Sequence, residues 1–440
     1  MEKSLPTHQK NSNRLGFHYY QDTVHYTERD IQTWLPLLMD LGVNWLILRS
    51  ETCRAIPETF LTSLIRAGIN PVIQFDLTLG QPPKVELVGP LVEAYTQWGA
   101  KVIQFYDRPN QRDCWPVSGW AQEDLVERFL DRFLPLADLT VKAGGSPVMP
   151  ALEPGGSFWD TAFLRSALEA IDRRKQAEVL DKLILSAYGW TFGHPIDWGS
   201  GGPERWPDVR PYLTPPQSQD QRGFCVFDWY RAISEAAVQK VFPMLVLQAG
   251  LPQHASSLSS VISKDECFND TLVDIFELVN KPSPTEPQEE DPAMINLGNE
   301  ILAVNFWLLG ADPGTPETPF AWFEGGAARL PAARIISESS NLVRTYTGCG
   351  GLDHDFLHRA AHPIQHYLLL PELNPEEMQG TLKLLIDFIH NNRPTIGFSL
   401  DEAILANRVT IAGGPAAQAQ PAIERLKRNG CQLDWIGYLA

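Results

Sequence analysis

Residues 101–110 read Lys-Val-Ile-Gln-Phe-Tyr-Asp-Arg-Pro-Asn, a short apolar run that ends in charged and polar residues. The run lies between two amphipathic stretches with helical spacing, residues 85–98 and 121–143. A short apolar run in that setting is typical of a buried parallel strand flanked by helices. The fold class therefore depends on how often this unit recurs along the chain.

The unit recurs eight times before residue 310. The predicted strands are 15–20, 43–49, 71–75, 101–106, 147–152, 183–188, 244–247 and 304–309. The predicted helices are 27–41, 57–67, 85–98, 121–143, 158–181, 228–241, 271–280, 293–303 and a last one at 333–346. The first of these helices starts with a Thr-x-x-Asp capping box at Thr27. Eight βα units indicate an α/β fold of the closed (β/α)8 TIM barrel type rather than an open sheet.

The pattern restarts near residue 362 with apolar runs at 364–370, 409–414 and 431–436, and helices at 375–392 and 418–429. We therefore predict an N-terminal tail (1–14), a barrel (15–350) and a small C-terminal α/β domain (360–440) with three parallel strands. Gly413 and Gly414 follow a strand, but without a GxGxxG motif a plain turn is favoured over a phosphate site.

The chain has a net charge of −17, which argues against nucleic acid and against anionic membranes as partners. No stretch approaches the roughly 20 apolar residues of a membrane span, and no signal peptide is seen, so we expect a cytoplasmic protein, or an extracellular one if a leader precedes this sequence. The six cysteines form no CxxC pair, so we expect no metal and no cofactor. The oligomeric state stays open.

The working residues of such barrels follow the carboxyl ends of the strands. The fourth strand ends in Tyr-Asp-Arg-Pro-Asn (106–110), the seventh in Leu-Gln-Ala-Gly (247–250), the second in Arg49, and the eighth contains Trp307. Over roughly residues 15–347 this arrangement resembles the clan A glycoside hydrolases. Their fourth strand commonly ends in Asn-Glu-Pro and their seventh in Thr-Glu-x-Gly. The resemblance implies that Arg108 stands at the acid/base position and Gln248 at the nucleophile position.

Retaining hydrolysis needs two carboxyl groups about 5–5.5 Å apart. A glutamine amide is a poor nucleophile, and an arginine stays protonated and cannot act as an acid and a base in turn. We therefore predict a pseudo-glycosidase, a non-catalytic protein that binds a carbohydrate or glycan or serves as a scaffold. One alternative is an active O-glycosyl hydrolase with relocated carboxylates. The preferred pair is Asp107 with Glu153, and the further candidates are Asp197 and Glu324. The other alternative is a purely structural assembly component.

Six further residues are candidates for ligand binding because of their places after strands and their likeness to the clan: His18, Arg49, Asn110, Tyr188, His194 and Trp307. Trp307 corresponds to an aromatic sugar platform, Asn110 to the Asn after the fourth strand, and Tyr188 to the Tyr of a His-x-Tyr pattern. For the aromatic residues and histidines the alternative is core packing, and for Arg49 it is a structural ion pair. The long loops 189–223 and 251–292 are candidate lids.

Overall fold

The computed structural model describes residues 14–207, 209, 220–251, 266–280, 295, 297–336, 364–371, 380–381, 383–392, 394–404, 406–413, 420–428 and 431–437. The chain divides into two compact units between Tyr346 and Thr347. Most of loop 251–292, residues 337–346 of the last predicted barrel helix, Gly414 and the tail 1–13 lie outside the described residues.

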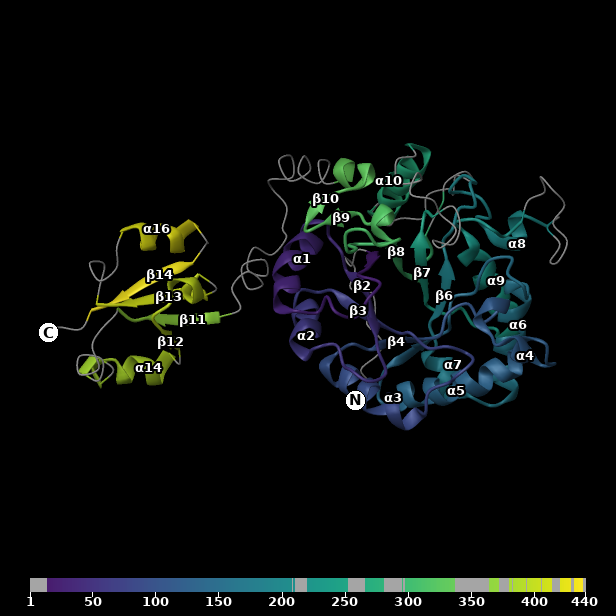
Figure 1. The fold of residues 1–440 in the computed structure, drawn as a ribbon, viewed down its shortest axis with the longest axis horizontal. Coiled ribbons are helices and arrows are strands. Elements are labelled where there is room, and N and C mark those ends of the chain that lie inside the picture. The colour runs from purple at the N-terminus through teal and green to yellow at the C-terminus, as the bar shows by residue number, and fades with distance from the viewer. Residues whose placement is uncertain are drawn as a thin grey trace. The chain divides into compact units, whose positions relative to one another are not determined.

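The first unit is built on eight parallel strands in the order β5-β4-β3-β2-β1-β8-β7-β6. They are β1 (Leu15–His18), β2 (Trp45–Ser50), β3 (Asn70–Phe75), β4 (Val102–Phe105), β5 (Ser146–Val148), β6 (Leu185–Tyr188), β7 (Met244–Ala249) and β8 (Ile301–Phe306). The first and last strands pair, and isolated parallel bridges, Val148 with Ile184 and Leu152 with Ala187, close the ring between β5 and β6. The predicted (β/α)8 barrel is confirmed (Figure 1).

Helices surround the strands (Figure 1). They include α1 (Glu28–Asp40), α2 (Glu58–Arg66), α3 (Val85–Trp98), α4 (Val117–Trp120), α5 (Leu125–Lys142), α6 (Asp160–Arg173), α7 (Ala177–Lys182), α8 (Gly202–Arg205), α9 (Val226–Val238) and α10 (Glu266–Asn280). The capping box predicted for the first helix is present, because Thr27 Oγ1 accepts from the Asp30 N–H while the Asp30 carboxylate accepts from the Thr27 N–H. Trp34 and Leu38 are the buried residues of α1.

Two predicted helices differ in the structure. The prediction of one helix over 293–303 is wrong, because residues 301–303 belong to β8 and pair with β7. The apolar residues Ile301, Leu302 and Ala303 suit either element, and pairing with the neighbouring strand decides between them. The single helix predicted over 158–181 is two helices, α6 and α7, separated where Lys175 adopts a left-handed backbone with φ of 56°.

The second unit is a parallel sheet in the order β12-β11-β13-β14. Its strands are β11 (Ile364–Leu369), β12 (Thr395–Gly397), β13 (Ala406–Ala412) and β14 (Gln432–Ile436), with helices α14 (Ile386–Asn392), α15 (Leu400–Ala403) and α16 (Gln420–Arg428). Three of these strands were predicted from the sequence. The prediction missed β12, because three residues carry no readable alternation.

No helix in the described ranges is long and apolar enough to cross a membrane. The cysteines within those ranges, five of the six in the chain, are free thiols.

The approach of three strands at Gly16 gives a stability prediction. Gly16 on β1 lies opposite Trp45 on β2 and Asn305 on β8. A Cβ atom added there would lie 2.1 Å from Asn305 Oδ1 and 2.9 Å from Trp45 Cβ. We expect Gly16→Ala to lower the free energy of unfolding by about 1–3 kcal/mol through overpacking, measured by urea titration with tryptophan fluorescence.

The matched control is Gly89→Ala in α3 of the same unit, because its added Cβ would lie no closer than 3.7 Å to Leu139, an ordinary van der Waals contact. A Gly16→Ala protein as stable as the control would contradict the close approach of β1, β2 and β8.

Candidate functional site

A cavity of about 480 Å³ lies at the carboxyl ends of the barrel strands. Every strand except β5 contributes to its wall, directly or through the residues that follow it, and the loops after β1 and β8 complete the rim. The lining residues are His18, Gln21, Arg49, Gln74, Phe75, Asp76, Leu77, Tyr106, Asp107, Arg108, Tyr188, Gln248, Trp307, Pro316, Glu317 and Phe320.

Arg108 bridges two carboxylates at this mouth. Its Nε donates to Asp107 Oδ2 at 2.9 Å, and its Nη1 donates to Glu153 Oε2 at 3.1 Å. Burial alone would lower the pKa of the Arg108 guanidinium, but the charge of Asp107 and the hydrogen bond to it outweigh burial and raise this pKa above its usual value. Arg108 therefore stays protonated, and both carboxylates are bound to the same cation.

A second set of contacts continues from Asp107 across the mouth to β7. The Tyr188 hydroxyl donates to Asp107 Oδ1, and the ring of Tyr188 stacks on Trp190 at 4.4 Å between centroids. Trp190 Nε1 in turn donates to Gln248 Oε1 at 3.0 Å. Burial and the negative charge of Asp107 raise the pKa of the Tyr188 hydroxyl well above its usual value, so it remains a donor. The contacts connect Gln248 through Tyr188 to Arg108.

The backbone at these strand ends adopts a left-handed conformation. The φ angles are 62° at Tyr106, 40° at Arg108 and 49° at Gln248. Residues with a side chain are uncommon in this region, which costs of the order of 1–3 kcal/mol each and persists only where the surroundings fix it. At Arg108 the surroundings include its N–H, which donates to the Ala151 carbonyl at 3.1 Å.

The Asn110 side chain connects two loops by hydrogen bonds to their backbone. Its side chain is fully buried, with Nδ2 donating to the carbonyls of Glu153 and Phe158 and Oδ1 accepting from the Glu153 N–H. These bonds join the loop after β4 to the loop after β5 and position Glu153 beside Arg108. Asn110 does not line the cavity, and its amide is already committed to the backbone.

Four of the lining residues have a buried side-chain polar atom without a hydrogen-bond partner among the described residues: His18 Nε2, Arg49 Nε, Tyr106 OH and Trp307 Nε1. A buried polar group without a partner costs about 1–3 kcal/mol. The rings of His18 and Trp307 meet edge to face at 4.9 Å, and the peptide after Trp307 is cis. Arg49 also pairs through Nη1 with Asp76 at 3.2 Å, and that carboxylate is 72% exposed.

His18 is neutral in the folded protein. Burial lowers the pKa of its imidazole to about 3, and the nearby charge of Arg49 acts in the same direction. A neutral imidazole offers one donor and one acceptor, which is the pairing that a sugar hydroxyl can use.

Other predicted site residues lie apart from the cavity lining. His194 stacks on Trp198 in the loop after β6, with ring centroids 4.0 Å apart. Glu324 is exposed on β9 (Phe323–Glu324), which pairs with β10 (Ala327–Ala328), and Asp197 is exposed in the same loop as His194. The structure brings together His18, Arg49, Asp107, Arg108, Tyr188, Gln248 and Trp307.

Sequence reasoning missed two acidic residues of the wall. Asp76 directly follows β3, so the strand-end rule could have found it. Glu317 lies eleven residues beyond the end of β8 in a loop whose path no local pattern predicts.

No protein-family model matches the chain, and no curated protein matches it. Solved structures with a similar fold include the GH39 enzyme from Xanthomonas axonopodis pv. citri, at 14% identity, TM-score 0.44, and coverage of 75% of this chain and 66% of that one. A monomeric β-xylosidase from Caulobacter crescentus CB15 has 12% identity, TM-score 0.43 and coverage of 74% and 67%. A GH39 β-xylosidase from Caulobacter crescentus has 12% identity, TM-score 0.44 and coverage of 76% and 72%.

The chain spans just under two thirds of the Xanthomonas enzyme's length. At this identity the likeness concerns the fold alone.

The neutral state of His18 gives a pH prediction. Folding lowers its pKa from the ordinary value of 6.5 to about 3, so the unfolded chain binds the proton first and the folded state loses stability as the pH falls below 6.5. Between pH 7.5 and 5.5, we expect wild type to lose about 1 kcal/mol of unfolding free energy relative to His18→Gln. Urea titrations at both pH values measure this difference. Curves that shift in parallel would contradict a buried neutral His18.

Proposed function

We propose that the barrel binds a carbohydrate in the cavity at the carboxyl ends of its strands and does not hydrolyse it. The observation that carries the proposal is the bridge from Arg108 to Asp107 and Glu153, two of the acids that could replace the missing catalytic pair. Gln248 occupies the end of β7 on the other side of the cavity.

The bridge opposes both roles that hydrolysis requires. A general acid must hold a proton, whereas a neighbouring guanidinium favours the ionised carboxylate. A nucleophilic carboxylate must approach the anomeric carbon, whereas Asp107 is held by Arg108 and Tyr188 and Glu153 is held by Arg108. The amide of Gln248 has no negative charge with which to stabilise an oxocarbenium ion.

The composition of the wall supports a sugar as the ligand. Trp307 and Phe320 supply aromatic surface of the kind that packs on the apolar face of a pyranose. Arg49, Asp76, Gln248 and Glu317 supply polar and charged groups of the kind that bond sugar hydroxyls. A cavity of about 480 Å³ lies in the range of ligand sites. The resemblance of the strand ends to clan A points to the same ligand class.

The hydrolase alternative would need a carboxylate that is free to react. Glu317 lines the rim and makes no ion pair with any described residue, so it is the acid left for such a role. The scaffold alternative predicts that no sugar binds at all. The next two experiments separate the three functions.

Binding is tested on a glycan array followed by calorimetry with the best ligand. We expect wild type to bind. Trp307→Leu keeps an apolar side chain but removes the aromatic surface, and losing about 1 kcal/mol of ring packing weakens binding about fivefold. Arg49→Gln is expected to weaken binding by a similar factor or more. The control is His194→Phe, an aromatic substitution outside the cavity lining, which should leave the affinity unchanged. An array without any bound glycan would favour the scaffold function.

Activity is tested on a panel of aryl glycosides. We expect no turnover by wild type, Glu153→Gln or Glu317→Gln, because the described residues place no pair of unpaired carboxyl groups in the cavity lining. Slow turnover is expected only in the double variant Arg108→Glu with Gln248→Glu, which places carboxyl groups at both strand ends. Turnover by wild type that Glu153→Gln or Glu317→Gln abolishes would establish the hydrolase alternative instead.

A further inference from the structure

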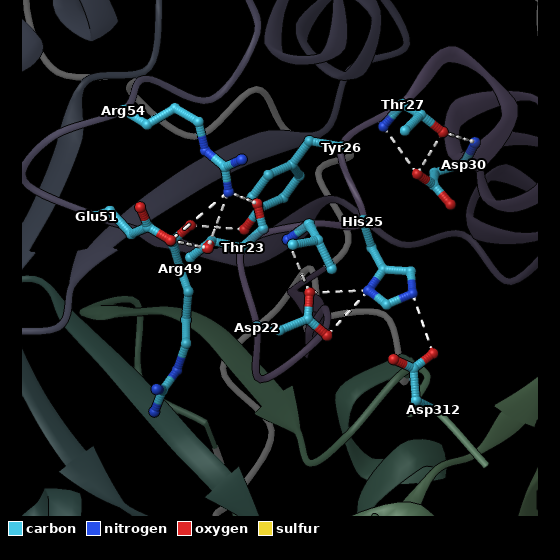
Figure 2. Close-up of polar contacts among 11 residues, drawn as sticks. Asp22, Thr23, His25, Tyr26, Thr27, Asp30, Arg49, Glu51, Arg54 and Asp312 are labelled. Carbon is cyan, nitrogen blue, oxygen red and sulfur yellow. Dashed lines mark hydrogen bonds and ion pairs between the residues drawn. The ribbon is translucent and has the colours of Figure 1, made fainter.

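The loops after β1 and β8 meet at His25, as Figure 2 shows. His25 Nδ1 lies 2.8 and 2.9 Å from the two carboxylate oxygens of Asp22, in the same loop. His25 Nε2 lies 3.2 Å from Asp312 Oδ1, in the loop after β8. We call these three residues the His25 bridge.

The geometry of the bridge requires a protonated ring. A carboxylate accepts hydrogen bonds and donates none, and a neutral imidazole carries a single N–H. With a carboxylate at each ring nitrogen, a neutral His25 would direct a lone pair at an oxygen of Asp22 or Asp312. The imidazolium form donates to both carboxylates and balances part of their charge.

The two halves of the bridge belong to segments that form the rim of the cavity. On the β1 side the ring of His25 stacks on Tyr20 at 3.8 Å, and Tyr20 contacts Trp34 of α1 at 5.8 Å between ring centroids. Gln21 of the same loop lines the cavity.

On the β8 side the carbonyl of Asp312 accepts from the hydroxyls of Thr315 and Thr318, at 2.9 and 2.7 Å. The residues enclosed by this turn and just beyond it include Pro316, Glu317 and Phe320 of the cavity wall. The bridge therefore connects the position of residues 312–320 to the protonation of His25.

A single metal ion explains the contacts less well. The candidate ligand atoms of Asp22, His25 and Asp312 lie within 4.8 Å of one another. However, Asp22 faces Nδ1 and Asp312 faces Nε2 of the same ring. A single ion can bind only one of the two nitrogens, so the carboxylate at the other nitrogen would be left outside the coordination shell.

We propose that the His25 bridge is a pH-sensitive latch that holds residues 312–320 at the rim of the cavity when His25 is protonated and releases them when it is neutral. The charged groups that face the ring are Asp22 from its own loop and Asp312 from the β8 loop, while Tyr20 covers a ring face. Asp30 at the start of α1 adds negative charge near Tyr20. The imidazole gains its proton as the pH falls and loses it as the pH rises, so the latch closes on the acidic side and opens on the basic side.

The test is amide hydrogen exchange of the full chain by mass spectrometry at pH 5.5 and 8.0, with EDTA present and with rates corrected for intrinsic exchange. We expect the peptide covering 312–320 to exchange at least threefold more slowly at pH 5.5 than at pH 8.0 in wild type. In His25→Gln it should exchange at the faster rate at both pH values, because the amide is neutral throughout. His194→Gln, a histidine outside the bridge, is the matched control and should keep the wild-type difference.

Unchanged exchange of α1 in His25→Gln would show that this variant is folded. If His25→Gln does not fold, Asp312→Asn serves instead, because it removes the β8 half of the latch and should have the same effect on exchange. A wild-type rate independent of pH, or a pH dependence retained in both variants, would overturn the latch. Protection at pH 8.0 that Zn²⁺ restores in wild type without EDTA, and not in His25→Gln, would overturn it in favour of a metal site. No glycan takes part, so the result is independent of the proposed function.

Discussion

Closure of the ring between β5 and β6 is the constraint on which the site depends. The ladder of β5 extends over three residues, and beyond it the ring is held by single bridges and by Ser186 Oγ, which donates to the Met149 carbonyl at 2.7 Å. The chain after β5 continues between its two neighbours, because Leu152 bridges to Ala187 on β6 and the Ala151 carbonyl accepts from the Arg108 N–H. These contacts place Glu153 where Arg108 and Asn110 reach it. The closure of the ring at this seam therefore positions the polar contacts at the mouth.

The charge at the mouth follows from the presence of one partly buried arginine. A buried charge is costly unless it is paired and hydrogen-bonded, and removing one partner of such a pair is strongly destabilising. Arg108 satisfies this requirement with Asp107 and Glu153, while Asp107 also accepts from Tyr188. The retention of two carboxylates at strand ends thus has a structural explanation that needs no catalysis. Asp107 and Glu153, which the sequence offers as catalytic acids, are therefore both bound to Arg108 in the fold.

The barrel was predictable because it depends on local order, and eight apolar runs separated by helices indicate the ring. Counting to the strand ends brings Arg108 and Gln248 to the same end of the barrel, where both line the cavity, whereas their correspondence to catalytic positions is only what the resemblance implies. The direction of a side chain on a loop is not local information. Asn110 looks like a ligand residue in the sequence, yet the turn after β4 directs its amide into the backbone of the β5 loop. The contact of His25 with Asp312 joins loops from opposite ends of the barrel sequence, and no spacing rule could have predicted it.

The left-handed backbone at the strand ends favours a binding site over a plain scaffold. Tyr106, Arg108 and Gln248 each adopt a conformation that costs of the order of 1–3 kcal/mol in a residue with a side chain. A barrel that served only for assembly would gain stability if glycine stood at these positions or if the turns relaxed. All three residues instead line the cavity, so the strained turns coincide with the cavity wall. In the same wall the Tyr106 hydroxyl and the Trp307 N–H have no hydrogen-bond partner among the described residues, which is a second cost. The strained backbone and the unpartnered buried polar atoms are independent costs at one cavity. Both have a common explanation if the fold maintains that cavity for a ligand.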